Sequence, residues 1–107
     1  MTVYMKQNDT LPAIIAQLVD ADGSIPDLTG AAVKFIMRLR SGGAAKVNAS
    51  ATIVAAATGD VKYSWSAADT DTVGDYEGEF QVTFSGGAIQ TYPNSMYFLI
   101  KVVDDIA

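Results

Sequence analysis

The stretch from Gly74 to Phe84 alternates apolar and polar side chains without interruption. Tyr76, Phe80 and Val82 fall in one phase, and acidic, amide and hydroxyl side chains fill the other. Because successive side chains of a strand point to opposite faces of a sheet, this period of two predicts a long strand with one aromatic and one acidic face. A lone strand cannot bury aromatic side chains, so the rest of the chain has to supply an apolar surface that covers them.

Other segments show a shorter alternation or a compact apolar run between turn residues. We predict strands at residues 3–6, 13–19, 33–39, 47–54, 61–65, 88–92 and 96–103. The run at 13–19 is interpreted as a strand and not as part of a helix because it is short and lies between a proline and a turn. Residues 66–71 predict a single helical turn opened by a serine cap.

Seven or eight short strands at intervals of roughly ten residues, separated by turn signals, are typical of a β-sandwich. The chain has 107 residues, enough to bury a core without metal or disulfide staples. We therefore predict an all-β chain, folded as an immunoglobulin-like antiparallel β-sandwich of about seven to eight strands, with one domain spanning residues 1–107.

Three details refine this prediction. The outer face of the strand at 33–39 carries cations, among them Arg38, which makes it an electrostatic neighbour for the acidic face of the central strand. Trp65, the single tryptophan of the chain, is expected to anchor the core. The Gly74-x-Tyr76 pair is typical of a tyrosine corner, in which the phenol donates to a nearby backbone group.

Composition excludes several classes of function. Twelve acidic against seven basic residues give a net charge of -5, which opposes binding to a phosphate backbone, so no nucleic-acid partner is expected. The chain has no Cys and no His, which excludes thiolate and imidazole chemistry, including the Ser-His-Asp arrangement. No apolar run approaches the roughly 20 residues that span a bilayer, so no membrane insertion is expected.

Two acidic arrangements invite chemical interpretations. Glu77 and Glu79 share a strand face in the manner of a glycosidase pair, and Asp20-x-Asp22-Gly23 begins like a calcium loop. A solvated strand face and a hydrogen-bonded turn are the favoured alternatives, because the second sequence lacks the later ligands of an EF-hand. We therefore predict a protein that is not an enzyme, with no catalytic residue, no cofactor and no metal ligand.

Aromatic side chains offer a further alternative, a sugar-stacking platform. The candidates are Tyr63, Trp65, Tyr76, Tyr92 and Tyr97. Trp65 and Tyr76 alternate in phase with core residues and are expected to be buried, whereas Tyr92, next to a proline and an asparagine, is expected at the surface.

Four pieces of sequence carry a resemblance to a known family. They are Asp-Leu-Thr-Gly-Ala-x-Val-x-Phe at 27–35, Gly-Asp-Val-x-Tyr at 59–63, Gly-x-Tyr-x-x-Glu-Phe at 74–80, and Pro93 before Phe-x-Ile-x-Val at 98–102. In this order the chain resembles the amino-terminal immunoglobulin-like domain of the tailed-phage upper baseplate protein family, over residues 11–103.

The resemblance implies a non-enzymatic structural protein of a bacteriophage or prophage virion, acting as a protein-protein docking module of the tail or baseplate, or as an adaptor. A capsid decoration protein and a carbohydrate-binding module are the alternatives. The implied partners are other virion proteins, within a symmetric oligomer, and the implied location is the virion. An isolated sandwich has to cover its edge strands, and assembly through an edge does this. The expected partner contacts are Val3, Tyr4, Lys6, Tyr92, Asn94 and Met96.

Overall fold

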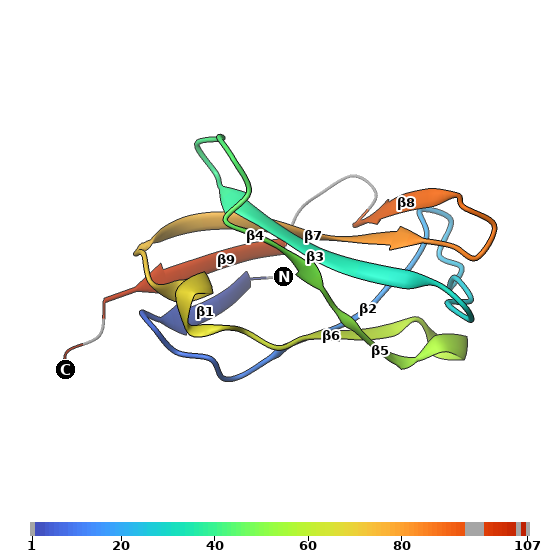
Figure 1. Ribbon diagram of the computed structural model, residues 1–107, viewed down its shortest axis with the longest axis horizontal. Coiled ribbons are helices and arrows are strands. Elements are labelled where there is room, and N and C mark those ends of the chain that lie inside the picture. The colour runs from blue at the N-terminus through green and yellow to red at the C-terminus, as the bar shows by residue number, and fades with distance from the viewer. Residues whose placement is uncertain (1, 94–97, 105, 107) are drawn as a thin grey trace.

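The computed structural model describes residues 2–93, 98–104 and 106, which form two stacked β-sheets (Figure 1). Within these ranges there are nine strands, two short 3-10 turns and no α-helix. The strands are β1 (Thr2–Lys6), β2 (Ile14–Gln17), β3 (Ala32–Leu39), β4 (Val47–Ser50), β5 (Thr52–Ala55), β6 (Asp60–Tyr63), β7 (Gly74–Thr83), β8 (Ile89–Tyr92) and β9 (Phe98–Val103).

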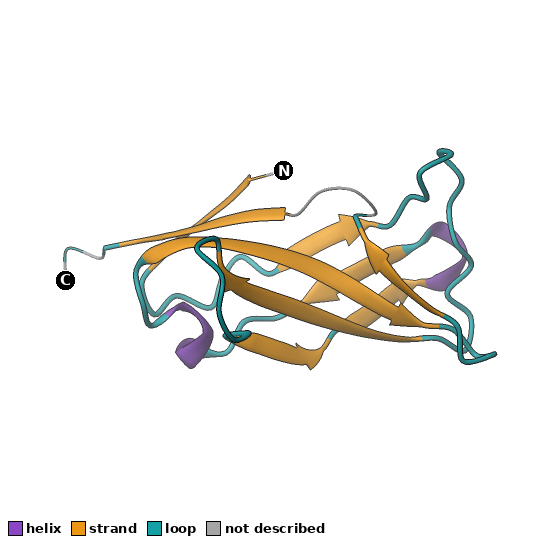
Figure 2. Cartoon of the chain, turned by 90° about the horizontal axis from the view of Figure 1, so that it is seen from above, coloured by secondary structure: helices purple, strands orange, loops and turns teal. Residues whose placement is uncertain are grey.

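The larger sheet has the order β1-β9-β7-β3-β4, and β8 pairs with the second half of β7. The smaller sheet has the order β2-β6-β5. All pairs are antiparallel except β1 with β9, which run side by side in parallel at one margin of the larger sheet (Figure 2). The prediction of an all-β, immunoglobulin-like antiparallel sandwich is confirmed, with one strand more than the upper expectation.

Strand β7 is the centre of the larger sheet, as its alternation predicts. Its inner side chains Tyr76, Phe80 and Val82 are at most 1% exposed. Gly78 lies in the same phase, and a Cβ there would come within 3.0 Å of the side chains of Ile100 and Phe35. The missing side chain of Gly78 therefore lets Phe35 cross under β7 and reach the smaller sheet.

Phe35 joins the two sheets through aromatic contacts. Its ring centroid lies 4.7 Å from that of Tyr63, 5.7 Å from that of Trp65 and 5.2 Å from that of Phe80. Trp65 follows β6 and is buried, as predicted, and its indole N–H has no hydrogen-bond partner among the described residues. The aromatic side chains therefore fill the space between the sheets around Phe35.

The segment predicted as one strand at 47–54 is two strands in different sheets, which corrects the prediction. β4 pairs with β3 in the larger sheet, and β5 pairs with β6 in the smaller one. The chain crosses between them at Ala51, whose N–H donates to the carbonyl of Val33 at 2.8 Å. The alternation continues through the crossing, so side-chain phase alone does not reveal it.

Two local predictions around β7 are confirmed. The segment after Trp65 forms a 3-10 turn, Ala67–Thr70, and the carboxylate of Asp69 accepts the backbone N–H of Ser66 at 2.9 Å. The hydroxyl of Tyr76 donates to the carbonyl of Thr72 at 2.8 Å, which is the tyrosine corner. Both contacts fix the approach of the chain to the start of β7.

Candidate functional site

Strand β1, predicted at residues 3–6, is an edge strand of the larger sheet. Val3 is half-buried, whereas Tyr4 is 69% exposed and Lys6 is exposed. No described residue pairs with the outer side of β1. Of the expected partner contacts, these three residues therefore lie on a strand that is free to take a neighbour; whether they contact one stays a prediction.

The backbone of β1 has a defined free side. The N–H of Gln7 donates to the carbonyl of Val103 in β9 at 2.8 Å. In a parallel ladder, alternate residues direct both backbone groups to the same neighbour, so Val3 and Met5 also face β9. Thr2, Tyr4 and Lys6 therefore direct their N–H and C=O groups away from the sheet.

Strand β2 is the edge of the smaller sheet and lies beside β1. Both strands line a depression of about 350 Å³, formed by Thr2, Val3, Tyr4, Pro12, Ala13, Ile14 and Ile15. Leu11, just before Pro12, and Ile15 are 76% and 66% exposed. We call this region the β1/β2 edge surface.

Lysine side chains flank the β1/β2 edge surface. Tyr4 is paired in register with Lys101 of β9, and Ile15 with Lys62 of β6. Lys6 follows at the end of β1, and no carboxylate lines the depression. The nearest acidic side chain to Lys101 in the larger sheet is Asp75, at 3.9 Å from its ammonium group. The edge surface is thus apolar at its centre and basic at its margins.

Tyr92, expected at the surface, is instead 1% exposed, so that expectation is wrong. Its hydroxyl donates to Asp20 at 2.7 Å, and the side-chain amide of Gln90 donates to the same oxygen at 3.0 Å. Burial and the nearby carboxylate both raise the pKa of Tyr92. The residue holds β8 to the turn after β2. The expected contacts Asn94 and Met96 lie outside the described residues.

The turn that begins like a calcium loop is held by its own hydrogen bonds. Asp22 accepts the backbone N–H of Ser24 at 3.0 Å and its hydroxyl at 2.6 Å, and these bonds lower the pKa of Asp22. Asp20 is occupied by Tyr92 and Gln90. Over the described part of the chain no group of three acidic or histidine side chains is placed to hold a metal ion.

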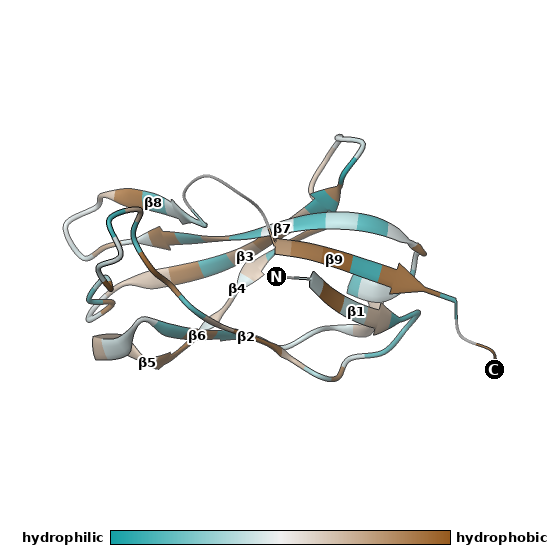
Figure 3. Cartoon of the chain, turned by 180° about the vertical axis from the view of Figure 1, so that it is seen from behind, coloured by the Kyte–Doolittle hydropathy of each residue, from teal (hydrophilic) through white to brown (hydrophobic). Residues whose placement is uncertain are grey.

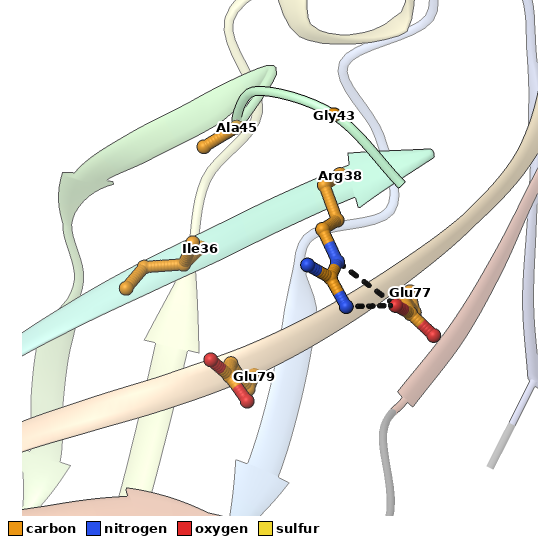
Figure 4. A pocket seen from close by; sticks show the side chains of 6 residues that line it. All are labelled: Ile36, Arg38, Gly43, Ala45, Glu77 and Glu79. Carbon is orange, nitrogen blue, oxygen red and sulfur yellow. Dashed lines mark hydrogen bonds and ion pairs between the residues drawn. The ribbon is translucent and has the colours of Figure 1, made fainter. Parts of the chain in front are cut away.

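A second depression, of about 310 Å³, lies on the outer face of the larger sheet under the loop at 41–45 (Figure 4). The Nε and Nη2 atoms of Arg38 both contact Oε1 of Glu77 at 2.9 Å, which confirms the predicted pairing of the cationic and acidic faces. Glu79 lies beside them on the same face (Figure 4). Because Glu77 is committed to this ion pair, the two glutamates form a charged strand face and no free carboxylate pair.

The alternative of a sugar-stacking platform does not fit its described members. Tyr63, Trp65, Tyr76 and Tyr92 are between 1% and 6% exposed, and Tyr97 lies outside the described residues. A sugar ring needs an exposed aromatic face, so these four side chains cannot provide one. The exposed aromatic ring of the described strands is that of Tyr4, at the β1/β2 edge surface.

Sequence reasoning missed the contribution of β2 to this surface. Ile15 falls within the almost wholly apolar run 13–19, and such a run does not say which residues are buried. The signal available was the apolar Leu11 before Pro12, an aliphatic residue in a polar loop.

Among the described residues, no helix has the length and apolar character to cross a bilayer.

Comparison with known proteins places the fold. No protein-family model and no curated protein matches the chain. A solved structure does match: it is the N-terminal domain of phage TP901-1 ORF48, a baseplate upper protein. The likeness has a TM-score of 0.67 at 23% sequence identity and covers 95% of this chain and 84% of that one. The chain therefore shares its fold with a phage baseplate domain.

Proposed function

We propose that this protein is a non-enzymatic structural protein of a phage or prophage virion, a docking module of the tail or baseplate or an adaptor between virion proteins. The likeness over nearly the whole chain to the N-terminal domain of a phage baseplate protein carries the proposal. The expected partners are other virion proteins, and the expected location is the virion.

The surface of the molecule supports a docking role. The aromatic side chains that could bind a ligand contact one another between the two sheets and hold them together. What the described residues offer to a partner is the β1/β2 edge surface, where apolar side chains and unpaired backbone groups lie together. Protein partners recognise such edges by adding a strand or an apolar patch.

The direct test is the composition of particles from the phage or prophage that encodes the chain. Mass spectrometry of washed, density-purified particles is expected to find the protein in a fixed ratio to the major tail proteins. Gold-labelled antibody is expected at the tail tip. Labelling of the head would favour the decoration-protein alternative, and absence of the protein from intact particles would contradict the proposal.

A further inference from the structure

We propose that the β1/β2 edge surface binds an extended segment of a different protein, which pairs with β1 as an added strand and carries apolar residues flanked by acidic ones. The proposal rests on the docking function proposed above and specifies its site and the chemistry of its partner. It follows from three properties of this edge: the direction of its backbone groups, the space beside it and its local charge.

The backbone of β1 is prepared for a neighbour. Thr2 and Tyr4 direct both of their backbone groups outward, as derived from the Gln7 to Val103 bond. Lys6 offers its outward N–H, while its carbonyl accepts from Asp9 at 3.1 Å. An extended segment placed alongside would satisfy these groups in a regular ladder, and such main-chain bonds provide affinity without a particular side-chain sequence.

The depression beside β1 lies where the inward side chains of an added strand would go. Inward residues of such a strand share the phase of Val3 and Met5, which face the smaller sheet. Across from them, Ile14 of β2 and the half-buried Ala13 just before it contribute to the lining. Small apolar side chains at every second position of the partner would therefore enter the depression and cover its walls.

Local charge selects an acidic partner segment. The chain as a whole carries a net charge of -5, yet Lys6, Lys62 and Lys101 flank the exposed Tyr4 and Ile15. Arg40 and Asp75 also lie beside Tyr4, and Asp75 pairs with Lys101 at 3.9 Å, so cations outnumber carboxylates around these two side chains. Complementary charge at the margin of an interface increases the rate of association and disfavours partners of the same sign. Carboxylates on the ends of the added strand would meet these ammonium groups.

The same charges argue against a second copy of this chain as the occupant. Two-fold pairing of β1 with itself would bring the same basic margin of each copy together and would join two chains of charge -5. On the opposite side of the sandwich, the chain itself connects the edges β4 and β5 through Ala51. Among the described edge strands, β1 has both an unpaired outer side and a depression beside it, which fits an unlike strand.

A pair of peptides tests the proposal on the ¹⁵N-labelled protein. One peptide has ten residues, with valine at every second position, threonine between, and aspartate at both ends; in the other, lysine replaces each aspartate. The acidic peptide is expected to shift the amide signals of β1 and of residues 12–15, and at saturation to slow hydrogen exchange of the Tyr4 amide about tenfold or more. The basic peptide is expected to have much less effect, and added salt should weaken the acidic one.

Three variants separate the backbone contribution from the side chains. Tyr4→Pro removes the outward N–H, which the fold does not use, and should abolish the peptide-induced shifts at residues 12–15 while leaving the unfolding midpoint in place. Tyr4→Ala keeps the N–H and should retain protection. Lys6→Glu should reduce the preference for the acidic peptide.

Four results would overturn the proposal. These are no shifts at β1 with either peptide, equal shifts with both peptides, binding that survives Tyr4→Pro, and a dimer that protects Tyr4 without any peptide. The last result would assign the edge to a second copy. Failure here is distinguishable from failure of the proposed function: if particles contain the protein and incorporate Tyr4→Pro normally, the docking role stands and the site is wrong.

Discussion

The two lateral sides of the sandwich are closed in different ways. On one side, β4 at the edge of the larger sheet continues into β5 at the edge of the smaller sheet with Ala51 alone between them. On the other side, residues 7–13 separate β1 from β2, and a depression of about 350 Å³ lies between these strands. Figure 3 shows β1 and β2 together on one side of the molecule, with apolar stretches in brown.

The difference lies in the length of the connection between the two edge strands on each side. On the first side the two edge strands follow each other along the chain with one residue between them. On the other side seven residues separate the two edge strands, and the depression lies between these strands. An accessible edge is an aggregation hazard unless a partner covers it.

The largest effect on stability is expected at a side chain on which both sheets depend. Phe35→Ala removes a fully buried ring that contacts aromatic side chains of both sheets, and it should lower the free energy of unfolding by about 3–5 kcal/mol. Urea denaturation measures the loss, with the exposed Val54→Ala as the control. A loss under about 1 kcal/mol would mean that the sheets do not depend on this contact.

A proline on the closed side should cost less. Ala51→Pro removes the N–H that donates to Val33 at the crossing and leaves that carbonyl without its partner, so the free energy of unfolding should fall by about 1–3 kcal/mol. Chemical denaturation is the measurement. Unchanged stability would show that the crossing is held by side chains and not by this hydrogen bond.

Alkaline pH should weaken the contact that ties the end of β2 to β8. Burial raises the pKa of Tyr92 in the folded chain above the ordinary value of 10.0. Above about pH 10 the unfolded chain therefore binds fewer protons than the folded one, and the free energy of unfolding falls as pH rises. In Tyr92→Phe this fall should be shallower. Urea midpoints between pH 8 and 11 measure both slopes, and parallel slopes would contradict the assignment.

The smallest effect on stability is expected on the open side. Tyr4→Pro substitutes an exposed residue whose N–H points away from the sheet, so the free energy of unfolding should change by no more than about 0.5 kcal/mol. Met5→Pro is the matched control, because its N–H faces β9 and its side chain is 2% exposed; it should be strongly destabilising. Equal losses in the two variants would show that the free side of β1 has been assigned wrongly.

Much of the interior could be predicted from the sequence. The alternation of β7 identified its buried face, Gly74-x-Tyr76 identified the tyrosine corner, and the cations of β3 identified the partner of Glu77. Each depends on a local pattern: a period of two, a short turn motif, or opposite charges on adjacent faces.

The rest depended on distant segments. Tyr92 looked exposed because proline and asparagine follow it, yet Asp20, 72 residues away in the chain, accepts its hydroxyl and lies over it. Ile15 looked buried within an apolar run, yet it points away from the core of a three-stranded sheet whose outer face is not covered. Neither outcome has a signal within the neighbouring residues.

The sequence by itself determined which side chains face inward, because the period of two describes the direction perpendicular to a sheet. The tertiary structure alone decided which strand lies beside which, because pairing runs within the plane of the sheet through backbone groups that every residue possesses. The crossing of the chain at Ala51 and the unpaired outer side of β1 both concern the arrangement of strands within the plane of the sheet. Side-chain alternation carries no information about it.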